Sequence, residues 1–140
     1  MIVHVNWKET DFHFEAENET EGKIRIDGNT SIGGFEGGMS PMQLLLAGIG
    51  GCSAIDILSI LEKKKQSVEG LTVRVDGDKQ SVGTFSEFKT IHMHYTFTGS
   101  VDIEKAKKAV ELSINKYCSV SKALEKTSEL SWELEVLPAS

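Results

Sequence analysis

Two cysteines, Cys52 and Cys118, are the residues of this 140-residue chain best suited to covalent redox chemistry. A thiolate can attack a peroxide and become a sulfenic acid, which a second thiol traps as a disulfide. The two lie in different halves of the chain and form no local motif such as Cys-x-x-Cys, so only the fold can bring them together. They are therefore either small buried residues or a redox pair.

Cys52 lies in the middle of a long predicted helix. Ser40, Pro41 and Gln43 are typical of a helix start, with a capping hydroxyl, a proline at the first helical position and a glutamine that can close a capping box. The apolar pattern extends the helix from Pro41 to about Lys64. Its length could span a membrane, but its interior glycines and polar residues favour a buried central helix.

Gly50 and Gly51 directly precede Cys52. A glycine inside a helix costs about 1 kcal/mol relative to alanine. We therefore expect another backbone or a substrate to approach the helix closely at this point.

Cys118 lies between two further predicted helices. The first has an apolar stripe at helical spacing, made of Ile103, Ala106, Val110, Ile114 and Tyr117. Ser119 and Ser121 indicate a break and a new short helix that extends through residues 121–127. Free N–H groups at the start of that helix favour a thiolate at Cys118.

Strands flank these helices on both sides. Alternating apolar residues predict three antiparallel strands before residue 28, then a glycine-rich loop over 28–39. Further strands are predicted at 71–75, 91–97 and 132–136, with a polar connection over 77–87. The fold class is α+β, with two antiparallel sheets around long central helices, and residues 1–140 are expected to form a single domain.

The central helix is too long and too apolar for one chain to cover. About 24 residues make a rod of roughly 36 Å, whereas a chain of this size has a radius of gyration of only about 14 Å. We therefore expect a homodimer.

Composition excludes several classes of function. The net charge is −6, which disfavours nucleic acid as a partner. The first residues carry no basic segment followed by an apolar run, so no signal peptide is predicted, and we expect a cytoplasmic protein with reduced thiols and no membrane partner.

Asp56 and two histidines are the other candidates for chemistry. Asp56 lies one turn after Cys52 among apolar residues, where a carboxylate needs a partner. An ion pair or hydrogen bond across the dimer is favoured over a role in proton handling. His92 and His94 share a strand face that points to solvent, so a metal there is disfavoured. No metal and no organic cofactor are expected.

The segments SPMQLLLAGIGGCSAIDIL and KYCSVSKAL resemble the OsmC/Ohr family, named for osmotically inducible protein and organic hydroperoxide resistance. The resemblance covers essentially the whole chain. It implies an intertwined homodimer in which Cys52 is the peroxidatic thiol and Cys118 the resolving thiol. It also implies an organic hydroperoxide substrate and a dithiol reductant.

The chain departs from the family pattern in two places. Active members carry a glutamate where this chain has Met42, and an arginine near the first hairpin, where none occurs between Trp7 and Glu17. Arg25 is the nearest arginine, on a strand position that points away from the core. The functions that remain are a thiol-dependent peroxidase and a non-catalytic protein that binds a small hydrophobic ligand in the dimer groove.

Overall fold

The computed structural model describes residues 1–9, 11–28 and 37–139. The chain forms two compact units, Met1–Leu45 and Leu46–Ser140. Most of the loop predicted over 28–39 lies outside the described residues.

The first unit is a three-stranded antiparallel sheet of β1 (Val3–Trp7), β2 (His13–Asn18) and β3 (Lys23–Asp27), in the order β1-β2-β3. The three predicted strands are confirmed. Val3, Val5 and Trp7 share one face of β1, and each is 56–58% exposed. An apolar sheet face with so much exposed surface needs a further layer to cover it.

Helix α1 (Pro41–Lys63) begins with the predicted capping box. The Ser40 N–H donates to Gln43 Oε1 at 2.9 Å, and the Gln43 N–H donates to Ser40 Oγ at 3.3 Å. By length and composition α1 could cross a membrane, yet it carries buried Ser53 and half-buried Asp56. Only 28% of its most apolar window is buried in this chain.

The second unit contains β4 (Ser67–Val82), β5 (Phe85–Ser100) and β6 (Glu129–Leu137), in the order β4-β5-β6. The α+β class is confirmed, but the sheet is mixed rather than antiparallel, because β6 pairs parallel to β5. The helical crossover after β5 returns the chain to the other end of that strand, which a parallel pair requires.

The prediction of a polar connection over residues 77–87 is also wrong. These residues belong to a long antiparallel hairpin that turns at Gly83, where φ is 65°. Beyond Thr90, where pairing with β6 begins, this two-stranded ribbon is held by its main-chain hydrogen bonds. Most of its side chains are exposed, so the apolar alternation of a half-buried strand is not needed there.

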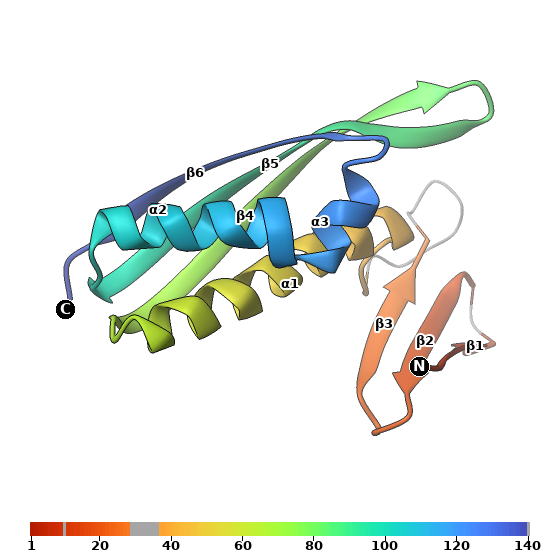
Figure 1. The fold of residues 1–140 in the computed structure, drawn as a ribbon. Helices are drawn as coiled ribbons and strands as arrows, with labels where there is room; N and C mark the ends of the chain where they lie inside the picture. The colour runs from red at the N-terminus through yellow and green to blue at the C-terminus, as the bar shows by residue number, and fades with distance from the viewer. Residues whose placement is uncertain (10, 29–36, 140) are drawn as a thin grey trace. The chain divides into compact units, whose positions relative to one another are not determined.

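Three helical segments link β5 to β6: α2 (Ile103–Leu112), a π-helical turn η2 (Ser113–Tyr117) and α3 (Ser119–Leu124). Figure 1 shows α1 and α2 together on one face of the β4-β5-β6 sheet. The core lies between these layers, where the following side chains are fully buried: Ile49, Ile57, Leu61, Ile91, Met93, Tyr95, Phe97, Ala106, Ala109 and Val110.

The opposite face of this sheet carries His92 and His94, as predicted. His94 lies between two carboxylates of β6, with Nδ1 3.0 Å from Glu133 Oε1 and Nε2 3.2 Å from Glu135 Oε1. His92 Nε2 lies 3.2 Å from the same Glu133 oxygen. Hydrogen bonds that the His94 ring donates to the Glu133 and Glu135 carboxylates raise the pKa of His94 above its ordinary value of 6.5.

Protonated His94 should therefore stabilise the β5–β6 pair. Because its pKa is raised on folding, this contribution is complete below pH 6.5 and is lost as the pH rises through the higher folded pKa. His94→Gln should flatten the fall in urea midpoint between about pH 6 and about pH 9. His4→Gln, in the other unit, should leave that slope unchanged; an equal slope in wild type and His94→Gln would contradict the assignment.

Tyr95 joins β5 to α1 through a buried hydrogen bond. Its hydroxyl donates to Ser53 Oγ at 2.8 Å, and burial raises the pKa of Tyr95 to about 12. Tyr95→Phe should lower the free energy of unfolding by about 1 kcal/mol, because the Ser53 hydroxyl loses a buried partner. Tyr117→Phe, at a half-exposed position, should change it by less than about 0.5 kcal/mol. Equal urea midpoints for the two variants would contradict this role.

Candidate active site

Helix α1 presents Cys52 and Asp56 on one side, one turn apart. Both side chains are half-buried. The neighbouring side of the helix packs against the sheet through buried Gly50, Ser53 and Ile57. The rotation of α1 therefore directs the thiol and the carboxylate toward the helical segments α2, η2 and α3 that follow β5.

The two glycines before Cys52 have different environments. A Cβ on Gly50 would lie 3.0 Å from Val75 Cγ2 of β4, so this glycine lets the helix approach the sheet closely. A Cβ on Gly51 would meet nothing within 4 Å. The predicted close approach is thus made by the sheet at Gly50, while the space beside Gly51 is open in the single chain.

Cys118 is positioned by the π-helical turn. Its N–H donates to the Ser113 carbonyl oxygen at 2.7 Å, which closes a wide turn at the end of η2. Such turns occur frequently at functional sites. The predicted break follows, and Cys118 caps α3, because the Ser121 N–H donates to Cys118 Sγ at 3.3 Å.

These elements bring three side chains together. The two cysteine sulfurs and one Asp56 carboxylate oxygen all lie within 4.8 Å of one another. Cys118 is buried, whereas Cys52 is only half-buried. The pair that sequence could only suggest is therefore assembled by the fold, with a carboxylate beside both thiols.

Ser113, the first residue of η2, links this segment to the Asp56 carboxylate. Its hydroxyl lies 3.1 Å from Asp56 Oδ2 and 3.4 Å from the Ser53 carbonyl oxygen, so its single proton can serve one of them at a time. Within the single chain, the Ser113 hydroxyl is therefore a hydrogen-bond partner of Asp56. Ser113 was not singled out from the sequence, although it shares a helical face with Ala106 and Val110.

The start of α3 acts on Cys118 in the predicted direction, because hydrogen bonds from Ser121 lower the pKa of this thiol, but burial has the larger effect. Burial raises the pKa of Cys118, and this effect exceeds the opposing hydrogen bonds from Ser121. The neighbouring Cys52 raises it further. The raised pKa favours the thiol form of Cys118, which is held in place by its capping hydrogen bond.

The residues that depart from the family pattern lie in the other unit. Met42 is half-buried in the first turn of α1, and Arg25 is exposed on β3. Among the described residues, no lysine, arginine or histidine forms an ion pair with Asp56.

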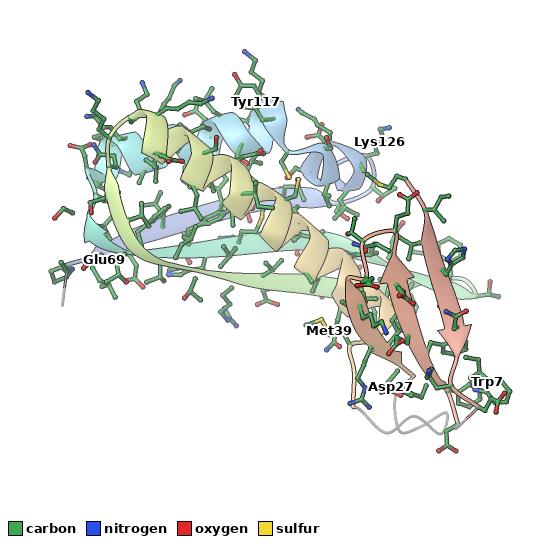
Figure 2. The ribbon with its side chains drawn as sticks, turned by 90° about the horizontal axis from the view of Figure 1, so that it is seen from below. Trp7, Asp27, Met39, Glu69, Tyr117 and Lys126 are labelled. Carbon is green, nitrogen blue, oxygen red and sulfur yellow. The ribbon has the colours of Figure 1, made fainter. Side chains whose placement is uncertain are left out.

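An open cleft of about 480 Å³ borders the carboxylate side of the site. Its lining combines apolar, basic and acidic side chains: Asp56, Ser59, Ile60, Lys63, Lys64, Leu112 and Tyr117. Tyr117 lies on the exposed side of the helical layer (Figure 2). A small molecule entering this cleft would meet Asp56 one turn from Cys52.

Comparisons with known proteins agree with this architecture. A family model described as "OsmC-like protein" matches residues 34–133. Protein YhfA of Escherichia coli K12 is 36% identical over 141 residues, which cover 99% of this chain and all of YhfA.

Solved structures match over nearly the whole chain. A hypothetical protein from Aquifex aeolicus is 29% identical with a TM-score of 0.79, covering 97% of this chain and 96% of that one. An organic hydroperoxide resistance protein OsmC from Legionella pneumophila shares the fold, with a TM-score of 0.73 at 18% identity over 96% of this chain and 95% of that one. The chain belongs to the OsmC-like family, within a divergent branch.

Proposed function

We propose that this chain is a thiol-dependent peroxidase that reduces organic hydroperoxides through Cys52 and Cys118. The observation that carries the proposal is the meeting of the two sulfurs within 4.8 Å, although the thiols come from different halves of the chain. Similarity to a protein named for organic hydroperoxide resistance supports the same substrate class.

The environments of the two thiols support different roles. Cys52 is the more accessible, beside the open space at Gly51, so it is the peroxidatic thiol that meets the substrate. Cys118 is buried with a raised pKa, so it does not compete for peroxide and acts as the resolving thiol.

The reaction balances with these two groups. The Cys52 thiolate attacks the terminal peroxide oxygen and the O–O bond breaks, so that Cys52 becomes a sulfenic acid. The alkoxide leaves and takes a proton from solvent to become the alcohol. Cys118 then attacks the sulfenic sulfur, its proton leaves with the hydroxyl group as water, and a disulfide forms. A dithiol reductant restores both thiols by taking up the two oxidising equivalents.

The alternative function is binding without catalysis. The cleft beside Asp56 has apolar walls from Ile60, Leu112 and Tyr117, which suit a small hydrophobic ligand. The chain also has Met42 where active members carry a glutamate. In this alternative Cys52 has no redox role. Whether peroxide oxidises Cys52 therefore distinguishes the two functions.

One equivalent of an alkyl hydroperoxide should remove both titratable thiols of the reduced chain. In Cys118→Ser, the sulfenic acid has no internal partner, so an excess of the hydroperoxide should over-oxidise Cys52 to the sulfinic acid, detected by mass spectrometry. In Cys52→Ser, the buried Cys118 should remain unmodified under the same conditions. Cys52 left unmodified in both wild type and Cys118→Ser would contradict the peroxidase and favour the binding protein.

We further propose that the working protein is a cytoplasmic homodimer in which residues 1–140 form a single domain. A second copy is the occupant that fits the uncovered apolar surfaces, because each chain exposes both an apolar sheet face and an apolar helix. On the sheet these are Val3, Val5, Trp7 and Ile24, and on α1 they are Leu45, Ile55 and Leu58.

Ile55→Arg should dissociate this dimer, because Ile55 is 72% exposed in the single chain and a charge there cannot be buried without a partner. Ile103→Arg, at an exposed position on α2, should leave it intact. Sedimentation at micromolar concentration measures both. A wild-type monomer of 15.4 kDa with native helicity would contradict the dimer.

A further inference from the structure

We propose that Cys52, Asp56 and Cys118 form a binding site for a thiophilic divalent cation of the zinc class. Such a site is separate from peroxidase activity and requires only the geometry of three side chains in the unit Leu46–Ser140. Sequence spacing alone predicts no metal here, because it places Asp56 near Cys52 but leaves Cys118 in a separate part of the chain.

The separations suit a tetrahedral zinc ion. Zinc–sulfur bonds of about 2.3 Å place two sulfurs roughly 3.8 Å apart, and a zinc–oxygen bond of about 2.0 Å places sulfur and oxygen roughly 3.5 Å apart. The three donor atoms already lie within 4.8 Å of one another. Closing onto an ion requires the separations to shorten by at most about 1 Å between the sulfurs and about 1.3 Å between sulfur and oxygen, which side-chain rotation can supply.

The charge of the cluster also favours a cation. Asp56 is half-buried, and the Ser113 hydroxyl, which donates a hydrogen bond to it, is neutral. In the described part of the chain no cationic side chain forms an ion pair with it. A divalent ion would neutralise the carboxylate and the two thiolates together.

The surroundings of the three donor atoms resemble a prepared metal site. The Ser113 hydroxyl bonds to Asp56 Oδ2, which orients the carboxylate in the way that outer partners orient metal ligands. The N–H of Ser121 holds Cys118 Sγ. Cys52 and Asp56 come from one rigid helix, so two of the three donors are fixed relative to one another.

The donor set selects the class of ion. Two thiolates and one carboxylate suit Zn²⁺ and Cd²⁺, whereas Mg²⁺ and Ca²⁺ require oxygen ligands. Three protein donors leave the fourth position of a tetrahedron for water. Because a disulfide removes two donors at once, the site exists only in the reduced chain, and a bound ion would keep peroxide from the thiols.

The experiment uses the reduced full-length chain. Cd²⁺ titration should give a thiolate charge-transfer band that saturates at one ion per chain, and competition with a chromophoric chelator should give the Zn²⁺ affinity. Asp56→Asn keeps both thiols and the acceptor for Ser113, and it should weaken Zn²⁺ binding at least about tenfold. Asp78→Asn makes the same change in charge on an exposed part of β4 and should bind as wild type does.

Two results would overturn the site: no cadmium–thiolate band in the folded, reduced chain, or Asp56→Asn binding Zn²⁺ as tightly as wild type. Circular dichroism confirms that the variant is folded. Peroxide oxidation of metal-free protein separates this inference from the proposed function. If peroxide removes the thiols but no metal binds, only the proposed metal site is rejected. If metal binds but peroxide does not remove the thiols, only the proposed peroxidase activity is rejected.

Discussion

The close approach of α1 to the β4-β5-β6 sheet determines where the other parts of the site can lie. At Gly50 the helix backbone comes so near β4 that an added methyl group would lie 3.0 Å from Val75 Cγ2. Tyr95 reinforces this approach, because its buried hydroxyl bonds to Ser53 on the same helix face. Once that face is held, Cys52 and Asp56 must point toward η2, which supplies Ser113 and ends at Cys118.

The carboxylate at the centre of this arrangement makes its chemistry depend on charge. Beside a thiolate, Asp56 is repulsive, and Met42 stands where the family pattern has the glutamate that holds an arginine near the thiol. With a divalent cation present, the same carboxylate is a ligand and the repulsion is relieved. Under the two proposals, one cluster would support redox chemistry in the metal-free chain and coordination in the metal-bound chain, and the two states would exclude one another.

Local patterns in the sequence predicted much of the local structure, although not the long hairpin over 77–87. The capping box at Ser40 and Gln43, the three alternating strands and the break after Cys118 all depend on neighbouring residues, and all are confirmed. The parallel pairing of β6 was not predicted, because a strand's direction depends on where the helical crossover delivers it. The raised pKa of Cys118 was not predicted either, because the depth of its burial depends on layers that are distant in sequence.

The uncovered surfaces of the chain are complementary in kind. One unit has an apolar sheet face with Trp7 56% exposed, and the other has an apolar helix with Ile55 72% exposed. A sheet is stably covered by a helix, and a helix by a sheet, so exchange of these surfaces between two copies would satisfy both at once. Such an exchange would place the second chain beside α1, the helix that carries Cys52. In the proposed dimer, the access of any substrate or metal ion to the cluster is therefore governed by how the two copies pack.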